Sequence, residues 1–236
     1  MDFKILFDKD AISPKFKTGW GFSVFIDGVL FDTGEDGNLL LSNLESEGIN
    51  INSIEKAVIS HDHWDHTGGL GPLLELKKDL KVYGCRDFSS QTKNKIKNSG
   101  AELIESSSPL QVKPNIYTTG EIFGFYKSMK ISEQSLVVKS QKGLVVITGC
   151  SHPGAVKIVE QVKKIFVKED IHLVFGGFHL INKEIREIKL IGQKLKDLAV
   201  KYVGPTHCTG YGAQQIFRQI FGNKYISVKV GKTITI

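Results

Sequence analysis

The sequence feature that most restricts the fold of this chain is the run HDHWDH at positions 61–66. It follows the apolar segment 56–60, which predicts a strand, and precedes two glycines. In an extended loop, side chains two residues apart point to the same side, so His61 and His63 can converge on one metal ion. Asp65 and His66, further along the bend, can reach a second. Imidazole and carboxylate groups bind zinc or iron without thiolate, so we expect a metal site here rather than a solvated polar loop.

Four ligands do not complete two metal sites, so the chain must supply others. Three of the remaining histidines, His152, His179 and His207, each follow an apolar strand and lie in loops with small residues. Loops at strand ends are where functional sites collect in α/β folds, and glycine lets the backbone approach a metal or a phosphate closely. His172 lies inside its predicted strand, and we interpret it as structural.

The rest of the chain alternates strands and amphipathic helices without a linker, which predicts one domain over residues 1–236. The predicted helices lie at 36–47, 70–76, 87–98, 155–166, 185–198 and 214–221. The predicted strands lie at 3–7, 21–26, 30–32, 56–60, 81–83, 102–105, 135–139, 144–148, 172–175, 202–204 and from 226 onward. Antiparallel strands early and βα units later suggest a mixed α/β protein with helices outside β-layers. Segment 106–134 is less regular, and we expect a loop or short hairpin that covers a site or simply packs on the surface.

Three features together resemble the metallo-β-lactamase-fold superfamily over essentially the whole chain. They are the HxHxDH run, the upstream segment LFDTG at 30–34 and the late histidines at strand ends. Segments 149–154, 176–180 and 205–210 are similar to a branch that includes the dihydropterin-ribofuranosylaminobenzene phosphate synthases and many bacterial relatives of unassigned substrate. The resemblance implies an α/β fold, a four-layer αββα sandwich of two similar halves with metals at one edge of the paired sheets.

The resemblance also implies two sets of metal ligands. One set is His61, His63 and His152, and the other is Asp65, His66 and His207. Asp32 would orient a ligand imidazole, although a simple turn aspartate is the alternative.

The sequence departs from the common superfamily pattern in two places. No histidine lies between His66 and Cys150, and we expect His152 to replace the missing ligand. Cys150 stands where the usual metal-bridging aspartate follows a strand, so it is either a thiolate ligand or a small buried residue beside the site. His179 is a candidate for substrate binding or proton transfer, with a packed or capping histidine as the alternative.

Two further residues lie beside these ligands in the sequence, Trp64 and Cys208. Trp64 either walls the pocket or packs against the sheet, and Cys208 is expected to face away from the metal. The catalytic candidates are therefore Asp65, which would hold metal and orient the nucleophile, and His179. No binding site for another cofactor is predicted.

The composition of the chain restricts the classes of molecule that it is expected to bind. The formal net charge is +6, but only three of the 31 basic residues are arginines, whereas nucleic-acid readers rely on arginine for bidentate contacts. A small anionic substrate is the simpler use of the charge. Three cysteines without a CxxC pair argue against a disulfide framework, and neither a signal peptide nor an apolar run of membrane-spanning length is present. We expect a cytoplasmic protein without a membrane partner.

The function expected from these features is that of a metal-dependent hydrolase. One or two divalent metal ions would activate water against a small phosphorylated or ester-type substrate, with zinc first and iron or manganese as alternatives. Three other functions are kept open: a pterin-transferring synthase, a nucleic-acid-processing or nucleic-acid-binding protein, and a non-catalytic metal-binding fold. The sequence does not predict an oligomeric state.

Overall fold

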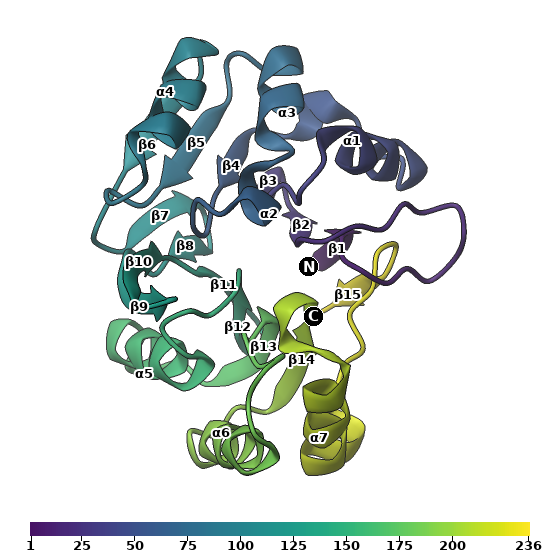
Figure 1. Ribbon diagram of the computed structural model, residues 1–236, viewed down its shortest axis with the longest axis vertical. Helices are drawn as coiled ribbons and strands as arrows, with labels where there is room; N and C mark the ends of the chain where they lie inside the picture. The colour runs from purple at the N-terminus through teal and green to yellow at the C-terminus, as the bar shows by residue number, and fades with distance from the viewer. The chain divides into compact units, whose positions relative to one another are not determined.

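The structure, a computed structural model, describes residues 1–236 and divides them into two compact units. The first unit comprises residues 1–107 and 229–236, and the second comprises residues 108–228. Each unit consists of a β-sheet with helices packed against it (Figure 1). The prediction of a single domain over the whole chain stays a prediction.

The first unit contains a seven-stranded sheet in the order β15-β1-β2-β3-β4-β5-β6. Its strands are β1 (Asp2–Phe7), β2 (Ser23–Ile26), β3 (Val29–Phe31), β4 (Lys56–Val58), β5 (Lys81–Gly84), β6 (Glu102–Glu105) and β15 (Thr233–Thr235). Strands β3 to β6 pair in parallel, while β15, β1 and β2 pair antiparallel. The loops after β3 and β4 therefore leave the sheet at the same edge.

The first unit has four α-helices and one short 3₁₀ helix, and the three longest α-helices bury apolar side chains in its core. The helices are α1 (Gly37–Ser46), α2 (Trp64–Thr67), α3 (Leu70–Leu76), α4 (Ser90–Asn98) and the short 3₁₀ helix η1 (Ile51–Ser53). Leu40 of α1, Leu73 of α3 and Ile96 of α4 belong to one core cluster with strand residues. Full burial of such a side chain contributes about 1.5–3 kcal/mol, so this packing rather than intrinsic helix propensity holds the short helices in place.

The second unit contains a six-stranded sheet in the order β14-β13-β12-β11-β8-β7, plus a two-stranded ribbon of β9 and β10. Its strands are β7 (Leu110–Lys113), β8 (Ile116–Thr118), β9 (Ile122–Tyr126), β10 (Met129–Glu133), β11 (Leu136–Ser140), β12 (Gly143–Thr148), β13 (Ile171–Gly177) and β14 (Tyr202–Thr206). Strands β12, β13 and β14 are parallel, so their carboxyl ends also lie at one edge.

Three longer helices connect or follow these parallel strands. They are α5 (Ala155–Ile165), α6 (Ile185–Asp197) and α7 (Tyr211–Phe221), with 3₁₀ turns η2 (His207–Thr209) and η3 (Gly222–Lys224) beside α7. Ile158, Leu195 and Phe217, one from each helix, join the apolar side chains of β12 to β14 in the second core cluster. The apolar residues at helical spacing thus face the sheet, as the sequence pattern predicts.

The structure differs from the sequence-based expectations in three places. Segment 106–134, expected to be a loop or short hairpin, contains the four short strands β7 to β10. The terminal strand, expected from Ile226, is confined to Thr233–Thr235. Parallel βα units occur in the first unit as well as in the second, because the helical segments 37–46 and 70–76 each connect neighbouring parallel strands. Among the helices of the structure, none has the length and apolar character required to cross a membrane.

Candidate functional site

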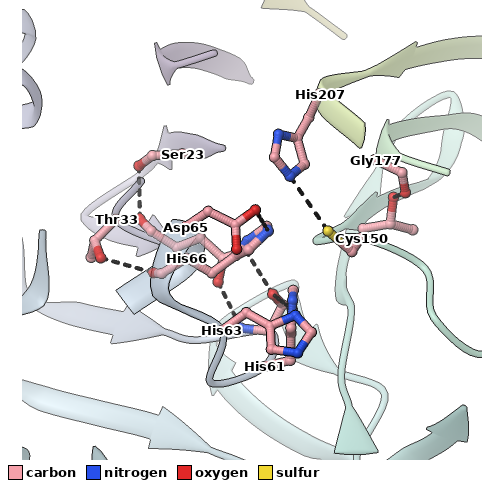
Figure 2. A network of polar contacts seen from close by, with 12 residues as sticks. Ser23, Thr33, His61, His63, Asp65, His66, Cys150, Gly177 and His207 are labelled. Carbon is pink, nitrogen blue, oxygen red and sulfur yellow. Dashed lines mark hydrogen bonds and ion pairs between the residues drawn. The ribbon is translucent and has the colours of Figure 1, made fainter. Parts of the chain in front are cut away.

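The HDHWDH segment of the first unit forms a tight loop between β4 and α2. His63 has extended backbone angles and occupies the N-cap position of α2, so Asp65 and His66 lie in the helix's only turn. One donor atom each from His61, His63 and Asp65 lie within 4.8 Å of one another. His61, Asp65 and His66 are buried, whereas Trp64 is 60% exposed. Figure 2 shows the four metal-ligand candidates of this loop and Asp65 beside His66.

Asp32, which follows β3, holds this loop from within the sheet. Its Oδ2 lies 2.6 Å from Nδ1 of His66, and its two oxygens accept hydrogen bonds of 2.7 Å from the backbone N–H and the hydroxyl of Ser60. The resemblance implied that Asp32 contacts an imidazole, and this contact is confirmed. Burial raises the pKa of the Asp32 carboxyl, while attraction to His66 and hydrogen bonds from His66 and Ser60 act in the opposite direction.

The hydrogen bonds of Ser60 also define the tautomer of His61. The Ser60 hydroxyl lies 2.9 Å from Nδ1 of His61. A hydroxyl has one proton, and here it donates to the Asp32 carboxylate, so it must accept from the N–H at Nδ1 of His61. Nε2 of His61 then carries the lone pair. The same holds for His66, because its Nδ1 proton is directed at Asp32.

Asp62, the other aspartate of the run, has a different role. The Asp62 carboxylate accepts a 2.7 Å hydrogen bond from the backbone N–H of Ser89, the residue that caps α4. Thr33 accounts for the position of α2, because its backbone N–H and hydroxyl both donate to the carbonyl of His66. These hydrogen bonds hold both ends of the loop in place. The imidazoles of the loop and the Asp65 carboxylate remain as the candidate metal ligands.

The donor set of this loop fits a divalent metal. Two imidazoles have Nε2 lone pairs fixed by hydrogen bonds at Nδ1, which is the arrangement found around metal-bound histidines. The Asp65 carboxylate adds a harder oxygen ligand, and the set as a whole suits zinc, iron or manganese.

The second unit collects its candidates at the carboxyl ends of three parallel strands. Cys150 and His152 follow β12, His179 follows β13, and His207 follows β14. The sulfur of Cys150 lies 3.4 Å from Nε2 of His207 (Figure 2). The sulfur of Cys208 also lies within 4.8 Å of the donor atoms of Cys150 and His179. Cys208 was expected to face away from the metal ligands, yet its sulfur belongs to this group.

Glu133, at the end of β10, is the site residue that sequence reasoning missed. It is 1% exposed and accepts four hydrogen bonds of 2.7–2.9 Å: three from the backbone N–H groups of Cys150, Ser151 and His152, and one from Nδ1 of His152. Burial is the largest influence and raises the pKa of Glu133, but the hydrogen bonds and the charge of His152 outweigh it and lower the pKa below its ordinary value. In the sequence, the only sign of this role is that Glu133 ends a segment in which apolar and polar residues alternate.

His179 lies among aromatic rings in the second unit. Its ring centroid is 4.6 Å from that of His152, and the Tyr126 ring lies 5.5 Å from His152 and 5.9 Å from His179. A hydrogen bond with Cys208 is the main cause that raises the pKa of His179. The backbone φ of His179 is +51°, a conformation that costs energy in a residue with a side chain and is concentrated at functional sites.

The packing around Cys208 depends on a glycine. A Cβ atom at Gly177 would lie 2.7 Å from the Cys208 sulfur and 2.3 Å from the carbonyl oxygen of Gly149. Burial raises the pKa of the Cys208 thiol, but its hydrogen bond with Cys150 and the neighbouring His207 and His179 lower it well below its ordinary value. The glycine thus makes room for the Cys208 sulfur in this group.

The structure therefore brings the predicted residues together within each unit. His61, His63, Asp65 and His66 form one group, and Cys150, His152, His179 and His207 share one sheet edge. The predicted division of these residues between two metal ions stays a prediction. His172, interpreted as structural, lies at the opposite end of β13.

Comparisons with known proteins agree with this picture. The model of the metallo-beta-lactamase superfamily matches residues 21–124. The 7,8-dihydropterin-6-methyl-4-(beta-D-ribofuranosyl)-aminobenzene-5'-phosphate synthase of Methanocaldococcus jannaschii is 30% identical over 245 residues, which cover 87% of this chain and 83% of that protein. The uncharacterized protein MJ0448 of the same organism is 30% identical over 269 residues, 99% of each chain.

Solved structures give the same result. The crystal structure of Tm1679, described as a metal-dependent hydrolase of the beta-lactamase superfamily, matches with a TM-score of 0.83 and 28% identity over 100% of this chain and 99% of that one. The predicted α/β fold of the metallo-β-lactamase type is confirmed. The chain belongs to the metallo-β-lactamase superfamily, in the branch that includes the dihydropterin-ribofuranosylaminobenzene phosphate synthase.

Proposed function

We propose that the protein is a metal-dependent hydrolase of a small phosphorylated or ester-type substrate. The observation that carries the proposal is the chain of hydrogen bonds from His61 through Ser60 and Asp32 to His66. It orients the Nε2 lone pairs of two imidazoles, which would reduce the cost of ordering these side chains if they bind a metal ion. The structural relative described as a metal-dependent hydrolase supports this reading.

The residues of the loop have distinct roles in this proposal. When bound, a divalent ion supplies Lewis acidity that lowers the pKa of a water molecule to about 7. His61 and His63 would hold that ion, and His66 is proposed as a ligand of the second ion; His61 and His66 are buried, which limits exchange with bulk solvent. The Asp65 carboxylate is proposed as a ligand that also orients the nucleophile by accepting a hydrogen bond from it.

We further propose that Cys150, His152 and His207 of the second unit are metal ligands, so that the protein binds two divalent ions, zinc first. We also propose that the protein is cytoplasmic, and the three free cysteines agree with such a reducing compartment. Elemental analysis of purified wild type, His63→Ala and His207→Ala measures both the identity and the number of the bound metal ions. Each variant is expected to lose about one ion per chain, and full metal content in either would remove that residue from the ligand set.

His179 is proposed to contact the substrate and to donate a proton to the leaving group. Its support is its place beside the rings of His152 and Tyr126 at the strand-end edge. A His179→Gln variant is expected to keep its metal content and lose about 10²-fold or more in kcat, the usual range for a general acid. A kcat equal to that of wild type would leave His179 with a packing role only.

The main test compares two aspartates of the same run. Wild type, Asp65→Asn and Asp62→Asn are assayed against phosphomonoesters, phosphodiesters, thioesters and lactams. Asp65→Asn is expected to lower turnover by about 10²-fold or more. Asp62→Asn is the matched control, because Asp62 binds the backbone of Ser89 instead and should keep activity. Equal turnover in all three proteins would place the chemistry elsewhere.

A pterin-transferring synthase is the second candidate, favoured by the 30% identity to the synthase of M. jannaschii. In that case an arylamine attacks, diphosphate leaves, and the site stabilises the departing charge. Incubation with a pterin diphosphate and an aminobenzoate-type acceptor distinguishes the two reactions. A joined product detected by mass spectrometry supports transfer, whereas release of phosphate or alcohol without an acceptor supports hydrolysis.

A further inference from the structure

The second unit has a basic pocket at the opposite end of its sheet from the histidine and cysteine group. The pocket has a volume of about 640 Å³ and lies where β13 and β14 begin. Its polar lining consists of Lys142, Asp170, His172, Lys196, Lys201 and Lys224. Strand β13 spans seven residues, so about 20 Å separate this pocket from the carboxyl end of the strand, which His179 follows.

The charge of this pocket is not balanced by the protein. None of its four lysines forms a salt bridge with a carboxylate, and Asp170 is the only acidic residue in the lining. Three positive charges therefore remain without a counter-charge in one concave surface. Such a surface concentrates anions, and the effect grows where the walls are of low dielectric constant.

A buried histidine in the same pocket has an unsatisfied nitrogen. His172 is 7% exposed, and its Nδ1 has no hydrogen-bond partner. Buried polar atoms are normally paired, and an unpaired one costs about 1–3 kcal/mol. Burial lowers the pKa of His172, and the charges of Lys201 and Lys142 lower it further, so both lysines act on this ring. The unpaired nitrogen is itself shielded from solvent, so the lysine side chains, and not this ring, carry the charge that a ligand in the pocket would meet.

Favourable interaction with the C-terminal ends of helices can explain only two of the four lysines in this pocket. Lys196 lies in the last turn of α6 and Lys224 follows α7, so both can interact with the carbonyls at helix C-termini. Lys142 lies in the turn between β11 and β12, and Lys201 precedes β14. Neither belongs to a helix end, yet both line the same pocket.

We propose that this pocket binds a small molecule that carries a diphosphate group. A single phosphate carries about −1.5 to −2 charges at neutral pH, so a diphosphate, with about −3, matches the three unbalanced lysines. The volume lies within the range of about 300–1,000 Å³ usual for small-molecule sites and exceeds what a diphosphate fills. Val200 and Phe221 provide an apolar wall for the organic part of the ligand. This site does not depend on the proposed hydrolase activity.

The test is isothermal titration of the purified protein with methylenediphosphonate, a diphosphate mimic that is not hydrolysed. Three proteins are compared: wild type, the pocket variant Lys142→Gln/Lys201→Gln, and the control Lys164→Gln/Lys168→Gln. The control removes the same charge from exposed lysines of the same unit outside the pocket. All three keep the histidine and cysteine groups, so binding at those groups is common to them.

We expect the pocket variant to bind at least tenfold more weakly than wild type and the control to match wild type. A second pocket variant, Lys196→Gln/Lys224→Gln, should give the same loss and guards against a folding defect in the first. Equal affinity in all proteins, no binding to wild type, or equally tight binding of inorganic sulfate would each overturn the proposal. So would a lowered melting temperature in the pocket variants with unchanged affinity, because the lysines would then serve stability alone.

Discussion

The two units of the molecule each hold an imidazole with a buried carboxylate, but they do so with different partners. In the first unit, Asp32 accepts from the ring of His66 and from the side chain and backbone of Ser60. In the second, Glu133 accepts from the ring of His152 and from three consecutive backbone N–H groups. The two carboxylates are both almost fully buried, so their environments differ chiefly in these donors.

This difference has opposite effects on the two acids. The pKa of Asp32 is raised, since burial outweighs its partners, whereas the pKa of Glu133 is lowered, since the partners outweigh burial. Backbone N–H groups cannot lose their protons or turn away, and they stabilise a carboxylate charge permanently. Glu133 therefore serves as the structural anchor of the loop at 150–152, while Asp32 serves mainly to set the orientation of two rings.

Removal of Glu133 should have the largest effect on stability. A Glu133→Ala substitution leaves three buried backbone donors and one imidazole without their acceptor. We expect a loss of about 3–5 kcal/mol in the free energy of unfolding, as for the loss of one member of a buried charged pair. Urea denaturation followed by circular dichroism measures this loss, with Glu160→Ala on the exposed face of α5 as the control. A loss below about 1 kcal/mol would mean that the backbone network does not anchor the loop.

The Asp32→Asn substitution should affect the metal more than the fold. Asparagine keeps the shape but has only one acceptor oxygen for three donors, so we expect a loss of about 1–3 kcal/mol in stability. Removal of the partner of a ligand imidazole typically weakens metal affinity by about 10–100-fold. Competition with a chromogenic chelator measures the affinity, and the exposed Asp10→Asn is the control. Wild-type affinity in Asp32→Asn would contradict the orienting role.

The Ser60→Ala substitution should give the smallest of the three effects. It removes the hydroxyl between His61 and Asp32 but leaves the contact of Asp32 with His66. We expect about 1 kcal/mol of lost stability and a fall in metal affinity of about tenfold, since the His61 tautomer is no longer fixed. The same chelator competition applies, with Ser42→Ala in α1 as the control. A fall as large as that of Asp32→Asn would show that the two rings are not held independently.

The sequence alone indicated the fold and most of the site because the relevant signals are local. The HDHWDH run has a spacing that imposes its own geometry, and the histidines after β12, β13 and β14 lie at strand ends that periodicity predicts. The role of Asp32 was implied by the family resemblance that the segment at 30–34 helps to carry. Each of these residues could be recognised from its immediate neighbours in the chain.

Glu133 and Cys208 could not be recognised in this way. Glu133 reaches residues 150–152 only because β10 ends beside the loop that follows β12, and no sequence spacing encodes that approach. Cys208 directly follows His207, and alternation suggested that it would face away. The chain instead enters the 3₁₀ turn η2 with a φ of +49° at His207, which breaks the alternation and keeps the sulfur in the group.

The close approach of the β9–β10 ribbon to the backbone of His152 determines which positions of the ribbon can change. A Cβ at Gly124 would lie 2.4 Å from the carbonyl carbon of His152, so only glycine allows the ribbon to occupy its present position. Phe125 and Met129, on the same ribbon, are 71% and 66% exposed. The ribbon thus combines one position at which only glycine fits with two exposed positions that can be exchanged at little cost in stability, so its outer surface can change in evolution while its contact with the backbone of His152 is kept.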